Sequence, residues 1–168
     1  MINRFATKLV VLALTLLTAQ GGLPEQIRRT LSRQFPGWEF ATLASSHQPN
    51  GSGSSPAWLA EDFDGDSRMD YVVQLVAPSS HGPVQRVLGF LRRGPDYILV
   101  PLDSFPPVPS TYLQLVPQGA VRANLDADEA GTRTFRLPHV AVDIVYDDQA
   151  AKTCWYAVPT FRCVLTGD

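Results

Sequence analysis

Short apolar runs separated by turn residues occupy the sequence from residue 57 onward. The runs are AWLAEDF, DYVVQLVA, VQRVLGFLRR, DYILVPL, TYLQLV, HVAVDIVYD, KTCWYAV and TFRCVLT. Their length, their β-branched and aromatic residues, and the Gly and Pro between them are typical of β-strands. No helical periodicity of useful length follows Phe35, so parallel βαβ architecture is not expected. The pattern predicts a twisted, mostly antiparallel sheet.

One amphipathic helix is expected ahead of these strands, in the stretch LPEQIRRTLSRQFPGW. Pro24 suits a helix start, and Ile27, Leu31 and Phe35 recur at four-residue spacing to form an apolar stripe. The Pro-Gly pair at 36–37 ends the pattern. We therefore predict an α+β fold, in which one N-terminal helix packs on the antiparallel sheet.

Composition predicts one domain. A chain of 168 residues with 45% hydrophobic content can bury a single core, and we assign residues 22–168 to one α+β domain. The formal net charge is -2, and the arginines do not gather into a stripe. Nucleic-acid binding is therefore not expected.

Residues 1–21 have the pattern of a signal peptide. Arg4 and Lys8 precede the apolar run LVVLALTLL, and small and polar residues follow it. This run is too short for a comfortable membrane span of roughly 20 residues. We expect export to the periplasm or the medium, with no membrane span after cleavage. A retained anchor or a buried N-terminal helix is the alternative.

The two cysteines, Cys154 and Cys163, frame the segment CWYAVPTFRC. If this segment is a hairpin that turns at Val158–Pro159, the two cysteines face each other across the strands, within reach of a disulfide. An oxidising compartment would allow the bond to form. Two unpaired thiols are the alternative.

Five acidic side chains lie within ten positions in the stretch EDFDGDSRMD. Carboxylates this close repel one another unless a cation lies among them, and a nine-residue loop of this spacing can wrap around Ca²⁺, which takes oxygen ligands. The twelfth position of an EF-hand would be Val73, so the loop is not an EF-hand. The predicted ligands are Asp62, Asp64, Asp66, the backbone carbonyl of Arg68, and Asp70. A metal-free Asp-rich turn is the alternative.

The stretch DFDGDSRMD, followed by YVVQLV, resembles the calcium loops of FG-GAP and VCBS-type repeats. The resemblance implies a strand on each side of the loop, with Asp62, Asp64, Asp66 and Asp70 as side-chain ligands. Ser67 stands where glycine is common in that family, and a positive φ there is costlier for serine. The motif occurs once in this sequence, so the resemblance covers the loop and not a repeated propeller. Most of the chain is also weakly similar to small exported bacterial proteins of unknown function.

Catalytic patterns are weak in this sequence. His47, His81 and His139 are far apart and form no zinc motif, and no GxSxG elbow occurs. The acidic pairs Asp126 with Glu129 and Asp147 with Asp148 are candidates for a glycosidase, although adjacent acids on a strand point to opposite faces.

We therefore expect a small exported, non-enzymatic module with mainly structural calcium, which binds a protein at the cell envelope. An exported hydrolase of an envelope polymer and an inhibitor or immunity-type protein are the alternatives. The aromatic residues Trp155, Tyr156, Phe161, Tyr146 and Tyr112 are either core residues or a recognition surface.

Overall fold

The computed structural model describes residues 22–41, 57–125, 133–146 and 150–166. The predicted signal peptide lies outside these residues, as do His47 and both acidic pairs considered for a glycosidase. The helix that the structure describes lacks the length and the apolar character of a membrane span.

The fold is mainly β. Of the described residues 56% are in strands and 8% in helix, so the predicted α+β class is wrong. The reason is that the eight apolar runs form most of the molecule, whereas the amphipathic pattern yields a single ten-residue helix, α1 (Glu25–Gln34). The expected antiparallel pairing is present throughout the described strands.

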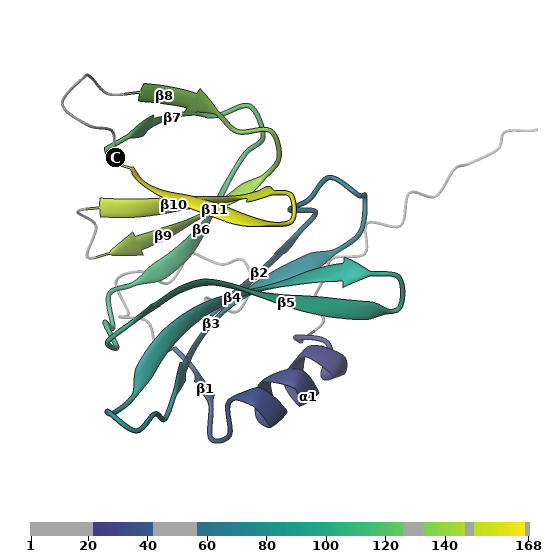
Figure 1. Ribbon diagram of the computed structural model, residues 1–168, viewed down its shortest axis with the longest axis vertical. Helices are drawn as coiled ribbons and strands as arrows, with labels where there is room; N and C mark the ends of the chain where they lie inside the picture. Colours follow the sequence, from purple (N-terminus) through teal and green to yellow (C-terminus); the bar gives the residue numbers. More distant parts are fainter. Residues whose placement is uncertain (1–21, 42–56, 126–132, 147–149, 167–168) are drawn as a thin grey trace, which may run out of the picture.

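The strands form two main sheets and a separate hairpin (Figure 1). The first sheet contains β1 (Glu39–Phe40), β2 (Trp58–Glu61), β3 (Asp70–Ala77), β4 (Val84–Arg93) and β5 (Asp96–Phe105). The second sheet has the order β11-β10-β9-β6, with β6 (Tyr112–Val116), β9 (Ala141–Tyr146), β10 (Ala150–Ala157) and β11 (Thr160–Thr166). The hairpin pairs β7 (Val121–Asn124) with β8 (Arg133–Arg136).

Four layers follow one another through the molecule: α1, the first sheet, the second sheet and the β7–β8 hairpin (Figure 1). Each junction between layers has its own apolar cluster. Ile27 and Leu31 of α1 pack with Val73 and Leu75 of β3. Phe63, Val72, Val142 and other buried residues fill the space between the sheets. Trp155 and Leu137 belong to the cluster beneath the hairpin.

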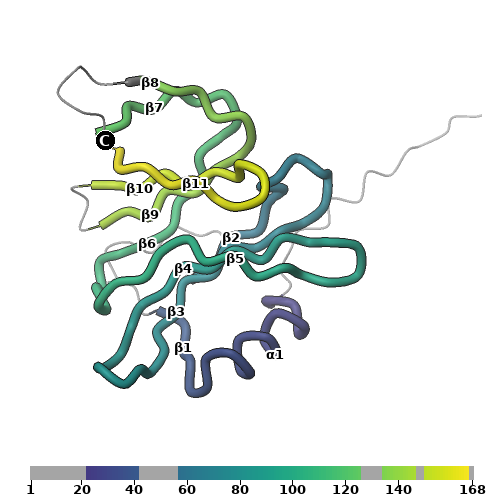
Figure 2. The backbone as a smooth tube through the Cα atoms, in the orientation of Figure 1, coloured from purple at the N-terminus to yellow at the C-terminus, as the bar shows by residue number. Residues whose placement is uncertain are grey.

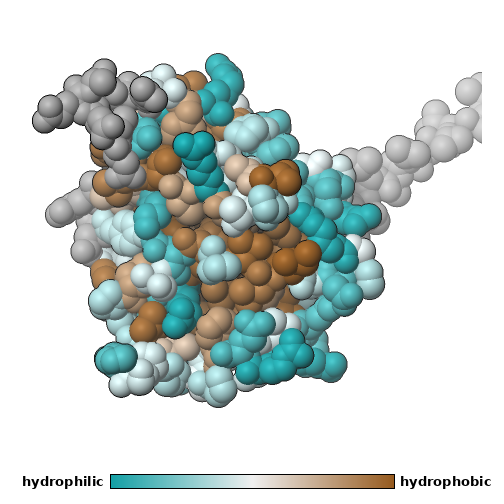
Figure 3. Space-filling view, in the orientation of Figure 1, coloured by the Kyte–Doolittle hydropathy of each residue, from teal (hydrophilic) through white to brown (hydrophobic). Residues whose placement is uncertain are grey.

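The first sheet and the second sheet lie close together along one edge, where β11 runs beside β5 (Figure 2). Gly89 of β4 makes this approach possible, because a Cβ at that position would lie 2.9 Å from the Phe161 ring of β11. Figure 3 shows apolar surface gathered over the middle of this face of the molecule. Ile98 of β5 and Val158, at the turn before β11, are among the exposed large apolar residues.

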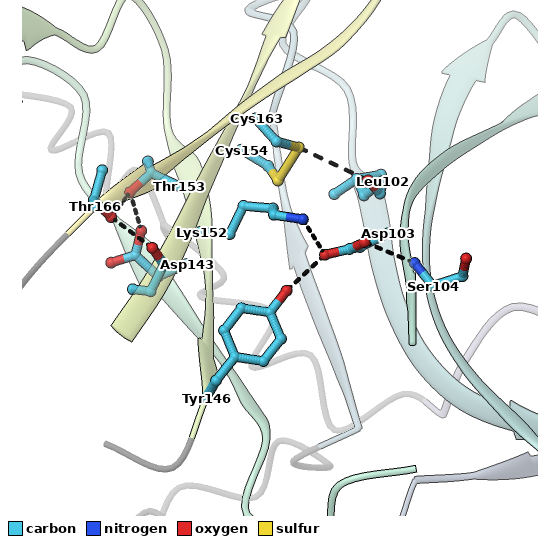
Figure 4. Close-up of a disulfide and its surroundings, with 11 residues drawn as sticks. Leu102, Asp103, Ser104, Asp143, Tyr146, Lys152, Thr153, Cys154, Cys163 and Thr166 are labelled. Atoms are coloured by element: carbon cyan, nitrogen blue, oxygen red, sulfur yellow. Dashed lines mark hydrogen bonds and ion pairs between the residues drawn. A yellow bond between two sulfur atoms is a disulfide. The ribbon is translucent and has the colours of Figure 1, made fainter. Parts of the chain in front are cut away.

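The C-terminal hairpin has the predicted register. Cys154 is paired with Cys163 and the two form a disulfide, with the turn at Val158–Pro159 between β10 and β11 (Figure 4). Trp155 lies opposite Arg162 on the other face of the same pair of strands. Side-chain alternation thus directs Cys154 into the space between the sheets and Trp155 towards the hairpin cluster.

A polar group also connects the two sheets. Asp103 accepts a hydrogen bond from the Tyr146 hydroxyl and another from the Lys152 ammonium, each at 2.6 Å (Figure 4). A β-bulge between Val87 and Leu88 shifts the pairing of β4 with β5, so that Asp103 lies opposite Val87. Burial, followed by the bond to Asp103, raises the pKa of Tyr146 well above its ordinary value. The phenol is therefore a hydrogen-bond donor at all physiological pH values.

Candidate metal centre

The acidic loop joins β2 to β3, as the sequence pattern predicted. Glu61 pairs with Asp70 at the end of the ladder, so the two ends of the loop lie side by side. Gly65 has a φ of 79° and Ser67 a φ of 63°. Both values are in the left-handed region, which is costlier for serine than for glycine. The sharp turn expected at Gly65 is therefore present. Ser67 also has a positive φ, which is unfavourable for serine and would be easy for the glycine that is common at this position.

Three of the predicted ligands converge. Asp62, Asp64 and Asp70 each offer a carboxylate oxygen, and these oxygens lie within 4.8 Å of one another. Asp70 is fully buried at the start of β3, and only 3% of the Asp64 side chain is exposed. Asp66 lies outside this group of three. The structure therefore brings together the first, third and ninth positions of the loop.

Asp62 organises the loop backbone. Its Oδ1 accepts hydrogen bonds from the N–H groups of Gly65 at 2.8 Å and Asp66 at 3.0 Å. Its Oδ2 accepts one from Ser67 at 2.8 Å. An aspartate that accepts several backbone N–H groups three to five residues ahead fixes a turn of the chain around its own carboxylate. The loop is consequently wound around Asp62.

Asp70 attaches the loop to the sheet. Its two oxygens accept the backbone N–H of Phe63 at 3.1 Å and that of Arg92 in β4 at 2.7 Å. Phe63 is itself buried between the sheets, with its ring 6.3 Å from that of Phe161. Burial, with a smaller contribution from the charges of Asp64 and Asp66, raises the pKa of Asp70 to about 6, although the backbone N–H of Arg92 opposes the shift. The loop is thus anchored by a carboxylate whose negative charge is unfavourable without a nearby cation.

Arg93 is a functional candidate that the sequence did not indicate. Its guanidinium forms an ion pair with Asp64 and lies 3.6 Å from Asp66. The same guanidinium donates a hydrogen bond at 3.3 Å to the hydroxyl of Tyr156 in the second sheet. The bond to Asp64 is the main cause that raises the pKa of Arg93. Arg93 pairs with Asp96 and therefore lies at the end of β4. The register of β3 with β4 places this end of β4 beside the acidic loop, which precedes β3.

His139 is a second residue beside the loop, although no motif pointed to it. Its ring lies against the backbone of Gly65, where a Cβ would be 2.6 Å from the ring. A hollow of about 390 Å³ adjoins this contact and is lined by Glu61, Asp62, Gly65, Gln118, His139 and Val140. His139 therefore packs on the loop as a neighbour, outside the group of converging carboxylates.

Arg68, whose carbonyl was predicted to be a ligand, is mostly exposed. Its backbone N–H donates to Asp66 at 2.9 Å, and its guanidinium lies 4.0 Å from the same carboxylate. Coordination by its carbonyl remains a prediction. Asp66 is thus held between two arginines, Arg68 and Arg93, rather than among the other carboxylates.

The donor set fits a hard cation. All the converging atoms are carboxylate oxygens, which suit calcium or magnesium better than softer metals. Each oxygen of Asp70 accepts one backbone hydrogen bond, as does Oδ2 of Asp62. A carboxylate oxygen has about two acceptor sites, so each of these atoms keeps capacity for a metal. The three residues could therefore hold an ion while keeping the hydrogen bonds that shape the loop.

Comparison of the chain with protein-family models, with curated proteins and with solved structures found no match. The assignment of a function therefore depends on the geometry of the described residues.

Proposed function

We propose that the β2–β3 loop binds one calcium ion, and that this ion stabilises the fold of an exported, non-enzymatic protein. The convergence of Asp62, Asp64 and Asp70, with Asp70 fully buried, is the observation that carries the proposal. A bound divalent cation would neutralise carboxylates that otherwise repel one another at the start of β3. The chain would use the ion to fix the loop between its two strands.

The choice of calcium follows from the form of the loop. Calcium accepts six to eight oxygens in flexible geometry, whereas magnesium requires near-ideal octahedral coordination and retains several waters. The three converging carboxylates, together with the predicted carbonyl of Arg68, offer a mixed and irregular oxygen set. The resemblance to FG-GAP and VCBS-type loops supports the same ion.

Export is supported by the disulfide between Cys154 and Cys163, because such bonds persist mainly in oxidising compartments. The signal-like segment at residues 1–21 supports it from the sequence. We propose a periplasmic or secreted location, with a protein of the cell envelope as the partner.

A non-enzymatic role is proposed because catalytic groups do not converge in the described residues. Ser80 Oγ lies 2.9 Å from His81 Nδ1, but both side chains are on an exposed turn. A serine nucleophile needs a base that a third group orients, and no described carboxylate contacts His81. This pair is better explained as a local turn contact.

Calcium titration tests the proposal. We expect calorimetry on the full chain to give one-to-one binding, and the melting temperature to rise with calcium because the ion binds the folded state. The Asp62→Asn/Asp64→Asn variant should lose the binding heat, whereas the control Asp96→Asn, at an exposed site that contacts Gln26, should keep it. Absence of heat and of a melting shift at millimolar calcium would contradict the proposal.

A further inference from the structure

A hollow of about 250 Å³ lies between the β7–β8 hairpin and the second sheet, away from the acidic loop. It is lined by Asn124 and Thr134 of the hairpin, Phe135, Trp155, Arg162 and Val164. Its apolar part is formed by Phe135 and Trp155, whose rings stack at 4.7 Å with an interplanar angle of 27°, and by Val164. A site of this size is smaller than the 300 to 1,000 Å³ that is usual for drug-sized ligands. It would hold one ring of a ligand.

Arg162 gives the hollow a positive charge. The side chain is exposed, and its guanidinium lies 5.8 Å from the centre of the Trp155 ring. Among the described residues no carboxylate pairs with it, whereas nearby Arg122 is bound to Asp143 at 2.8 Å. A guanidinium held against an aromatic ring is already oriented, and it matches a carboxylate by two parallel hydrogen bonds. The free charge complements an anionic group on the ligand.

Trp155 supplies a second unused group. The residue is 9% exposed, and its indole N–H has no hydrogen-bond partner among the described residues. The indole nitrogen is not among the buried polar atoms that lack a partner, so it reaches solvent and can donate to a ligand. Thr134 adds a hydroxyl to the rim of the hollow. The site therefore combines a cation, a hydroxyl, an indole N–H and aromatic side chains.

We propose that this hollow binds a sugar ring that carries a carboxylate, as in the hexuronic acid units of acidic polysaccharides. Such a ring offers apolar C–H groups to the parts of Phe135, Trp155 and Val164 that line the hollow, hydroxyl groups to Thr134, and a carboxylate to Arg162. The hollow is open to solvent, so the ring can belong to a longer chain. The proposal does not depend on calcium, because none of the lining residues belongs to the acidic loop.

The test is an NMR titration of the ¹⁵N-labelled full chain with a trimer of galacturonic acid, beside the neutral glucose trimer. We expect the acidic trimer to shift the indole resonance of Trp155 while those of Trp38 and Trp58 stay in place. The neutral trimer should bind at least tenfold more weakly. Equal binding of the two trimers, or an indole resonance of Trp155 that does not shift, would overturn the proposal.

Two variants locate the interaction. Arg162→Gln should weaken binding of the acidic trimer about tenfold or more, and it should fold normally because the side chain is exposed. Arg33→Gln, at an exposed position in the last turn of α1, is the matched control and should leave binding unchanged. An equal loss in both variants would mean nonspecific charge attraction and would overturn the site. Tighter binding of a short peptide through its C-terminal carboxylate would overturn the sugar assignment.

Discussion

Gly65 meets two separate structural requirements at the turn of the acidic loop. Its φ of 79° favours glycine, and the His139 ring occupies the space that a Cβ would need. Gly94 shares only the first requirement, since it has a φ of 62° with nothing within 4 Å of a Cβ. The two glycines therefore form a matched pair for mutation.

We predict that Gly65→Ala lowers the free energy of unfolding by about 2 to 4 kcal/mol, and that Gly94→Ala lowers it by only about 1 kcal/mol. The difference reports the displacement of His139. Urea denaturation of both variants measures it. Equal losses in the two variants would show that the His139 ring moves aside at no cost.

Arg93 is the counter-charge of Asp64 in the described structure. Its guanidinium pairs with Asp64, so it opposes a second cation through like-charge repulsion. We predict that Arg93→Gln tightens calcium binding about three- to tenfold at low ionic strength, and lowers the melting temperature of the calcium-free protein. Calorimetry on the variant tests this, with Arg92→Gln as the neighbouring control. Weaker binding would mean that Arg93 positions Asp64 for the ion.

At the scale of the elements, the β10–β11 hairpin is the most constrained part of the second sheet. Its disulfide joins residues nine positions apart, and the bonded pair faces the apolar space between the sheets. Closing so short a loop reduces the entropy of the unfolded chain modestly.

We predict that Cys154→Ser/Cys163→Ser lowers the free energy of unfolding by about 3 kcal/mol, chiefly through the unfolded chain. A buried hydroxyl at position 154 and a half-buried one at position 163 would add to the loss. Thermal unfolding of the variant, compared with the wild type with and without reductant, measures the effect. An unchanged melting temperature would show that the surrounding strands hold the hairpin without the bond.

At the scale of the whole molecule, the buried carboxylate of Asp70 links protonation to stability. Its pKa is raised from 3.8 to about 6 in the folded protein, mainly by burial. The folded state therefore binds the proton more tightly than the unfolded chain does. Between about pH 4 and pH 6 the folded state holds more protons, so raising the pH through this window lowers stability.

We predict that deprotonation of Asp70 lowers the free energy of unfolding of the calcium-free protein by up to roughly 3 kcal/mol between pH 4 and pH 7. The figure corresponds to about 1.4 kcal/mol for each pKa unit of the shift. Denaturation in chelator at several pH values tests this, and Asp70→Asn should remove that part of the dependence. In saturating calcium the trend should reverse, because protons compete with the ion for the carboxylate. A calcium-free protein whose stability rises through this window would contradict the raised pKa.

The acidic loop has contacts in more than one of the four layers. Asp70 bonds to β4, Arg93 bonds to the second sheet through Tyr156, and Phe63 is inserted between the sheets. The acidic loop is therefore connected to both sheets. An ion bound there would stabilise more of the molecule than the β2 and β3 strands that the loop joins.

The sequence by itself determined the local features of this protein. Apolar runs and turn residues predicted the strands, the apolar stripe predicted α1, and the ten-residue cysteine segment predicted the hairpin, its register and its disulfide. The spacing of the acidic loop predicted that Asp62, Asp64 and Asp70 converge, although it also placed Asp66 with them, which lies apart. These predictions succeeded because each depends on residues close in sequence, whose geometry follows from side-chain alternation and short-range turns.

Only the tertiary structure decided the arrangement of the strands in two sheets, and with it the mainly-β class. It also decided which side chains surround the acidic loop, since Arg93 and His139 reach it from distant segments through the β3–β4 pairing and the packing of the second sheet. The hollow at Trp155 and Arg162 likewise exists because the β7–β8 hairpin lies over the outer face of the second sheet. Contacts of this kind depend on how buried faces pair, and alternation along one strand does not specify the partner of its face.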